Sequence, residues 1–440
     1  MGINRLRCRW FFIVIFFFIF FIIRLIFGLF SEFWFPDELQ IYLLGLKFYS
    51  TKLWPYFGPD VVYTSSQIPG ALQALLVGLP FFVLPVPEAP FILLNILSFF
   101  ALLLLGWYIG KLLPEIPKWF LWIYLFTAPW VLNISTHILN VSYLLFGSVI
   151  FFIGVLELIP QFRKNLISPY LGMAMIGFGF FWVYQLHMSW VLMVPFIILV
   201  FIFQLKEKKS NILKLILFFI LGSLITGSLV IPTYIKYGFI RGTGGTYENI
   251  KLQLKNLLNI LNIVVRFFSF ASFEISRFIG AGTKSRLLFL KEYKWVGPFI
   301  IYSTLFGVSQ IVIMIINLFY KEKNLSWRFF KILIVATILL IYLSFLFSIK
   351  GPSAHTFYVV LPLSMIYFFL AFRNYLLKKF WRRLAIIFLF SAIVVHIGIE
   401  IRNLKEKSLY KNRSLVVKSI QEKNFLILGE RRKTKSGIGY

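Results

Sequence analysis

The stretch WFFIVIFFFIFFIIRLIFGL, residues 10–29, decides the fold class of this protein. It is 20 residues long and holds one charged side chain, that of Arg24. About 20 consecutive apolar residues are what an α-helix needs to cross the hydrocarbon core of a bilayer. The stretch is too long for a cleaved signal sequence and lacks a small-residue cleavage site, so we expect it to remain as the first membrane span.

Similar apolar runs follow along the whole chain. Of its 440 residues 60% are hydrophobic and only 14% are charged, where a soluble domain carries roughly 25% charged residues. Lipid offers no hydrogen-bond partners to the backbone, so spanning segments of this kind are helices. The composition predicts an all-α polytopic membrane protein. Its further apolar runs lie near 68–84, 91–110, 118–134, 141–159, 169–186, 188–204, 211–231, 296–319, 329–348, 357–372 and 384–400.

The positive charge of the chain is placed between these runs. There are 45 Lys and Arg against 16 Asp and Glu, a net charge of +29. Short basic clusters between apolar runs are the orientation signal of membrane proteins, and we expect no nucleic-acid partner. The clusters are Arg5–Arg9, Lys111 with Lys118, Arg163 with Lys164, Lys206–Lys209 with Lys214, Lys321 with Lys323 and Arg328, and Arg373–Arg383.

All six clusters fall on the cytoplasmic side if the run 68–84, which is broken by glycine and proline, lies in the interface. The positive-inside rule then predicts about 11 transmembrane helices within a domain of residues 1–400. The outer face receives a first loop at 30–90, a turn at 133–142, a long loop at 232–295, a loop at 349–356 and a basic tail at 401–440. The tail is too short and too charged to form a core of its own.

The first outer loop holds the only two aspartates of the chain, Asp37 and Asp60. Pro36 suits the first turn of a helix, and carboxylates directly after it favour a helix start. Leucines at helical spacing then predict an amphipathic juxtamembrane helix over 36–50. Asp37 and Glu38 are the best candidates for acid–base chemistry. The alternative is that they only favour the start of this helix on a solvated face.

Polar residues also gather at the other outer turns. They are His137, Asn140, Gln185 with His187, and the late group Lys350, His355 and Tyr358. Each is typical of a helix that leaves the bilayer. Their common side predicts a polar site at the outer surface. The single cysteine, Cys8, excludes an intramolecular disulfide, and no residue spacing typical of a metal site is present.

The chain resembles the type C (GT-C) membrane glycosyltransferases over roughly residues 8–400, in particular the protein mannosyltransferase and aminoarabinose transferase branch, glycosyltransferase family 39. The resemblance rests on Asp37-Glu38 in the first outer loop, on Gln67-Ile-Pro-Gly70 with Gln73, and on His355-x-x-Tyr358-x-x-x-Pro362. Two positions depart from the family. Asn140 stands where an acidic residue is often found, and Gln67 where some relatives have a phosphate-binding lysine.

The resemblance implies a glycosyltransferase with a GT-C fold that takes its sugar from a polyprenyl phosphate, with inversion. Asp37 would be the general base and Glu38 would orient the acceptor. The donor phosphate would be bound by Lys350, His355 and Arg241, and the substrates by Gln67, His137, Asn140, His187, Tyr358 and Asp60. The resemblance further implies that the enzyme uses no cofactor and no metal.

The expected location is the bacterial cytoplasmic membrane, with the site facing outward and a glycolipid, a glycan or a protein as acceptor. The sequence does not distinguish these acceptors, nor does it identify the sugar or the oligomeric state. Two alternatives stay open at this point. One is a non-catalytic flippase or exporter of lipid-linked glycans, which would need a charged central cavity. The other is an envelope-assembly scaffold, which would tolerate loss of Asp37.

Overall fold

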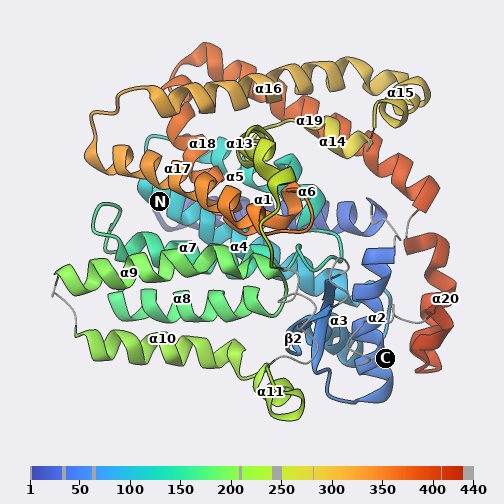
Figure 1. Ribbon diagram of the computed structural model, residues 1–440. Helices are drawn as coiled ribbons and strands as arrows, with labels where there is room; N and C mark the ends of the chain where they lie inside the picture. The colour runs from blue at the N-terminus through green and yellow to red at the C-terminus, as the bar shows by residue number, and fades with distance from the viewer. Residues whose placement is uncertain are drawn as a thin grey trace.

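The computed structural model confirms an all-α, multi-pass membrane protein (Figure 1). It describes residues 2–31, 36–61, 66–207, 211–239, 250–280, 282–407 and 409–429. Seven helical segments in this part of the chain are long and apolar enough to cross a membrane. They are α1 (Gly2–Ser31), α4 (Ala89–Leu112), η1 with α9 (Met188–Met193, Val194–Glu207), η3 with α16 (Lys294–Val296, Gly297–Phe319), α17 (Leu325–Leu346), η4 with α18 (Ala354–Val360, Leu361–Leu376) and α19 (Lys379–Lys407).

Several further apolar helices are shorter or broken. The pair α10 (Ile212–Gly227) and α11 (Ile231–Tyr237) bends by 71° at its break. α7 (Leu144–Leu158) and α8 (Pro169–Tyr184) are short apolar helices, and Pro129 separates α5 (Lys118–Thr127) from α6 (Pro129–Ile134). The total of 11 spans is reached if the bent pair, α7, α8 and α5 with α6 each cross the membrane, so that number stays a prediction.

The loops that carry most of the predicted cytoplasmic basic clusters lie at one end of the helix bundle (Figure 1). Ion pairs join the loops that carry basic clusters: Arg163 to Glu207 at 2.7 Å, and Arg373 to Glu322 at 3.1 Å. We call this the basic end, and define it by the loops at 113–117, 159–168, 320–324 and 377–378. At the other end α2 (Pro36–Thr51) and α20 (Leu409–Gln421) lie across the long helices (Figure 1). We call that one the Asp37 end.

The first loop builds a small layer at the Asp37 end. Helix α2 forms where the sequence predicts it, but it is more enclosed than an amphipathic surface helix, with Tyr42, Leu44 and Leu46 almost fully buried. It packs on α3 (Leu72–Val83), and a Cβ atom at Gly78 would lie 2.6 Å from the carbonyl oxygen of Gly45. Twelve residues give a helix of about 18 Å, too short for a hydrocarbon core of about 30 Å. A hairpin of β1 (Phe57–Val61) and β2 (Ser66–Pro69) joins α2 to α3.

The segment expected as a long outer loop at 232–295 is partly inside the bundle. After η2 (Leu254–Asn259), helix α13 (Ile260–Ser269) packs against α16, α17 and α18. Its apolar side, with Ile263, Phe267 and Phe268, is fully buried, and the Phe268 ring lies 5.7 Å from that of Tyr367. The chain then returns through α14 (Ser276–Ile279) to α15 (Thr283–Glu292).

The tail that the sequence analysis begins at residue 401 is ordered over most of its described part. α19 continues to Lys407, and α20 with η5 (Phe425–Leu428) packs on α2. Leu409, Val416 and Ile420 are buried in this contact, and Arg413 pairs with Glu88 at 2.8 Å. The C-terminal helix is therefore part of the layer that holds Asp37.

Arg24 is fully buried in the bundle, and its hydrogen bonds explain how a charge is accommodated there. Its guanidinium donates to the carbonyl oxygen of Phe126 at 3.2 Å, and to the hydroxyls of Ser98 at 3.2 Å and Ser135 at 2.8 Å. Ionisable groups inside a membrane are costly unless they find such partners. The residue ties α1 to α4, α5 and the turn after α6.

Candidate functional site

Asp37 lies in the first turn of α2 with an exposed side chain. His355, at the start of η4, is close enough to interact electrostatically with the Asp37 carboxylate. These two residues are 318 positions apart in the chain, so the structure places within electrostatic range two of the residues that the sequence proposed for one site.

Two cations share this neighbourhood. His355 also lies within electrostatic range of Lys350, from the loop before η4, and of Arg277 in α14. The Lys350 side chain is exposed, whereas His355 and Arg277 are half-buried. A carboxylate, an imidazole and two cations from α2, η4, its preceding loop and α14 therefore form a mixed-charge cluster, which we call the Asp37 cluster.

Arg277 was not among the residues proposed from the sequence. Its guanidinium carbon lies 4.8 Å from the centre of the Trp130 ring, a distance typical of a cation–π contact. Burial lowers the pKa of Arg277 to about 10, and the nearby Arg266 and Arg286 add to this while Glu274 opposes it. Arg277 stays protonated at neutral pH. Like charges gathered in this way favour the binding of an anion.

A row of asparagines holds the loop that carries Lys350. The Asn256 amide is 2% exposed and donates to the carbonyl oxygens of Phe345 and Ser348, both at 2.8 Å. One turn further, Asn259 donates to Asn256 Oδ1 at 3.3 Å, and Asn262 donates to the carbonyl oxygen of Pro352 at 3.3 Å. The spacing of three residues puts these amides on one side of η2 and α13, so this segment fixes the loop.

We expect Asn256→Ala to loosen this loop. The loss of two hydrogen bonds, each with a net contribution of about 1 kcal/mol, should raise the equilibrium constant for local opening of the loop roughly 30-fold. The rate at which trypsin cleaves the purified protein after Lys350 should rise by about the same factor. Leu258→Ala is the matched control, because Leu258 is 90% exposed on the same segment. Equal cleavage rates for the two variants would show that the amide does not hold the loop.

Two histidines proposed as substrate-binding residues differ in position. His187 lies within range of His355, and its Nδ1 accepts from the Ser189 backbone N–H at 3.1 Å. His137 is 4% exposed, its Nε2 lies 2.6 Å from the Ser31 hydroxyl, and its ring stacks on Phe27. Burial lowers the pKa of each to about 3, so both are neutral at pH 7. His187 borders the Asp37 cluster, while His137 holds α1 to the turn after α6.

Three polar residues of the turns make contacts that shape the layer around the cluster. The Asn140 amide donates to the carbonyl oxygen of Leu186 at 3.2 Å, one residue before His187. Gln67 is buried, faces Asp60 across the hairpin and donates to its carboxylate at 3.4 Å. Asn140 thus positions the turn of His187, and Asp60 with Gln67 belongs to the hairpin.

The remaining proposed residues lie deeper or outside the described part. Glu38 is 7% exposed, so it faces the protein interior while its neighbour Asp37 is exposed. Tyr358 is fully buried, with its ring 5.8 Å from that of Phe270. Arg241 lies in 240–249, outside the residues that the structure describes.

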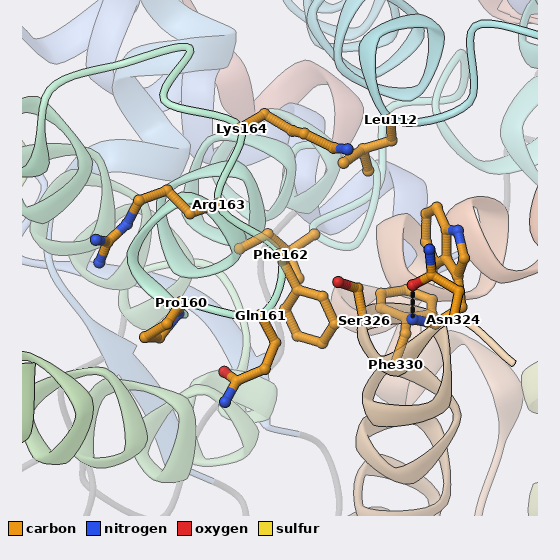
Figure 2. Close-up of a pocket in the computed structure, with 11 residues that line it drawn as sticks. Leu112, Pro160, Gln161, Phe162, Arg163, Lys164, Asn324, Ser326 and Phe330 are labelled. Carbon is orange, nitrogen blue, oxygen red and sulfur yellow. Dashed lines mark hydrogen bonds between the residues drawn. The ribbon is translucent and has the colours of Figure 1, made fainter.

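A cavity of about 190 Å³ lies at the other end of the molecule. Its lining includes Lys164 and Asn324, which lie in loops of the basic end (Figure 2). None of the residues of the Asp37 cluster lines it. The cavity and the cluster are therefore separate features.

No family model, curated protein or solved structure matches this chain. The function proposed below is therefore based on the residues of the Asp37 cluster and on their placement in the fold.

Proposed function

We propose that this chain is a membrane glycosyltransferase of the GT-C type, which moves a sugar from a polyprenyl phosphate to an acceptor hydroxyl with inversion. The observation that supports this best is the Asp37 cluster. It combines an exposed carboxylate with an imidazole and two cations from three other segments at one end of a membrane bundle. Such a place suits a donor whose lipid lies in the bilayer and whose sugar lies at the surface.

Each part of the cluster has a role in this reaction. The acceptor oxygen attacks the anomeric carbon, and the Asp37 carboxylate takes the proton of the hydroxyl. The bond between the anomeric carbon and the phosphate oxygen breaks, and polyprenyl phosphate leaves with the electron pair. Negative charge grows on the phosphate during this step, so cations placed beside it lower the barrier.

Arg277 and Lys350 are the cations that we assign to the phosphate. Arg277 takes the place that the sequence analysis gave to Arg241, since its half-buried guanidinium is oriented by Trp130 and stays charged. His355 and His187 border the same space and would bind neutral groups of the sugar or a phosphate oxygen. Glu38 and Asp60 would support the layer from which Asp37 extends.

The proposed orientation puts the basic end in the cytoplasm and the Asp37 end outside, in a bacterial cytoplasmic membrane. A topology of 11 spans accords with it if the bent pair α10 with α11, the short helices α7 and α8, and α5 with α6 each cross the bilayer. A labelling experiment tests the orientation in a Cys8→Ser background. Thr51→Cys and Lys255→Cys should react with an impermeant maleimide added to intact cells, and Glu115→Cys should react only after lysis. The reverse pattern would contradict the proposal.

The function is tested by reconstituting the purified protein in proteoliposomes with polyprenyl-phosphate sugars and a panel of glycolipid, glycan and peptide acceptors. A transferase releases polyprenyl phosphate and forms a glycosylated acceptor. A flippase moves the donor across the bilayer and leaves it intact, and a scaffold does neither. The two products are separated by mass, so this measurement discriminates the three functions.

A further inference from the structure

The cavity at the basic end is lined by both apolar and polar side chains. Its volume of about 190 Å³ lies below the roughly 300–1,000 Å³ of pockets for drug-sized ligands, so it suits a headgroup fragment. The apolar lining residues include Leu112, Phe162 and Phe330, and the polar ones include Lys164, Asn324 and Ser326 (Figure 2).

The turn that carries Lys164 is held rigidly by its own hydrogen bonds. The Glu157 carboxylate accepts from the backbone N–H groups of Lys164 at 3.2 Å and Leu166 at 2.9 Å. Arg163 donates to the carbonyl oxygen of Glu157 at 3.1 Å and pairs with Glu207 at 2.7 Å. The position of the Lys164 backbone is thus set before any ligand arrives.

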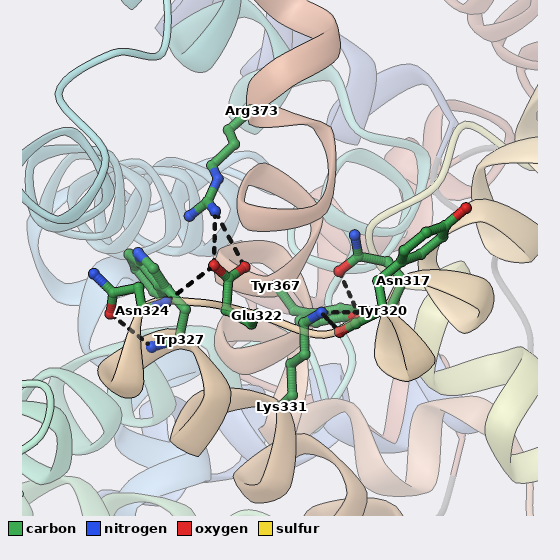
Figure 3. A network of polar contacts seen from close by, with 8 residues as sticks. All are labelled: Asn317, Tyr320, Glu322, Asn324, Trp327, Lys331, Tyr367 and Arg373. Carbon is green, nitrogen blue, oxygen red and sulfur yellow. Dashed lines mark hydrogen bonds and ion pairs between the residues drawn. The ribbon is translucent and has the colours of Figure 1, made fainter.

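The carboxylates near the cavity are already engaged. Glu322 accepts two bonds from Arg373, at 3.1 and 3.2 Å, and Lys331 holds the end of α16 through the carbonyl oxygens of Asn317 and Tyr320 (Figure 3). Glu157 and Glu207 are engaged as described above. Among the described residues no carboxylate lies within 4 Å of the Lys164 ammonium, so its charge remains available to a ligand in the cavity.

The start of a helix complements this cation. The 22-residue helix α17 begins next to the cavity, where the Asn324 side chain accepts from the Trp327 backbone N–H at 3.2 Å. Asn324 and Lys164 both line the cavity, so the helix start adds partial positive charge on the same side as the Lys164 ammonium.

We propose that this cavity binds the headgroup of an anionic phospholipid from the leaflet at the basic end. Lys164 and the start of α17 bind the phosphate. This site is independent of sugar transfer, because none of its residues belongs to the Asp37 cluster.

The proposal is tested with the full chain in nanodiscs of phosphatidylcholine, with and without phosphatidylglycerol. Phospholipid that stays bound is measured by native mass spectrometry, and the melting temperature is measured in parallel. The variants are Lys164→Gln, which removes the cation, and Ser326→Phe, which fills part of the cavity. Lys214→Gln is the control, since it removes the same charge from an exposed position at the same end that does not line the cavity.

We expect Lys164→Gln to lower phosphatidylglycerol retention about fivefold, Ser326→Phe to lower it similarly, and Lys214→Gln to leave it unchanged. Equal losses in the Lys164 and Lys214 variants would overturn the site in favour of diffuse surface charge, as would no loss in either. Inorganic phosphate serves as a separate probe. If it raises the melting temperature through Lys164 and phosphatidylglycerol does not, the phosphate site stands and the lipid is excluded as its source.

Discussion

Asp37→Asn should lower the turnover number for sugar transfer by about 10²–10⁴-fold, the usual contribution of a positioned general base. The amide keeps the size and the hydrogen-bonding shape of the carboxylate but cannot take the proton of the acceptor. Substrate binding should change little, so the loss should appear in kcat more than in KM. Because Asp37 is exposed in the first turn of α2, the variant should fold normally, as its melting temperature will show.

Asp60→Asn is the matched control for this experiment. Asp60 is the other aspartate of the chain, it lies in the same loop, and it contacts Gln67 within the hairpin. We expect its replacement to leave turnover within a few-fold of the parent. A folded Asp37→Asn protein with full turnover would remove Asp37 as the base, and equal losses in the two variants would indicate an indirect effect of the loop.

Arg277→Gln should lower kcat/KM by about 10²–10³-fold, the loss seen when one group that stabilises developing negative charge is removed. The guanidinium is half-buried and stacked on Trp130, so its charge acts in a less polar place than the charge of a surface residue. Arg277→Lys keeps the charge without the planar stack and should recover part of the loss. The measurement is the rate of polyprenyl phosphate release at several donor concentrations.

Lys291→Gln is the control for net charge, because Lys291 is exposed on α15 in the same outer segment. It should lower the rate by less than about threefold, as expected for a screened surface charge. If Arg277→Gln and Lys291→Gln behaved alike, the phosphate would not be bound by Arg277. A full rescue by Arg277→Lys would show that charge alone suffices and that the contact with Trp130 has no role.

The sequence predicted the parts of the cluster that lie close to recognisable helix ends. Asp37 follows a proline that starts a helix, and Lys350 and His355 stand directly before an apolar run. Such positions can be assigned to one side of the membrane from hydropathy and charge. Their meeting depends on contacts between segments that are far apart in the chain, which periodicity does not encode.

Arg277 shows what the sequence could not predict. It lies in a segment expected as a surface loop, yet α13 enters the bundle beside it and Arg277 stacks on Trp130 from α6. The apolar residues Ile263, Phe267 and Phe268 at helical spacing were a signal for a buried helix, and three arginines at 266, 277 and 286 were a signal for an anion site. Neither signal says which other helices lie nearby.

His137 shows that the position of a residue at an outer turn does not fix which side chains it contacts. It stands at an outer turn like His187, but its ring is used against Ser31 and Phe27 of α1. Whether a polar residue at a helix end faces a site or a neighbouring helix is decided by how that end is rotated. Rotation is set by side-chain packing across the whole bundle.

The sequence by itself determined that this is an all-α membrane protein, because the length and hydropathy of apolar runs are local properties that decide whether a segment enters the bilayer. The tertiary structure decided which polar residues come together at the Asp37 end. It inserted α13, fixed the Lys350 loop through Asn256, and placed His355 within electrostatic range of both Arg277 and Asp37. These contacts arise from close packing between distant segments, and so no local pattern could specify them.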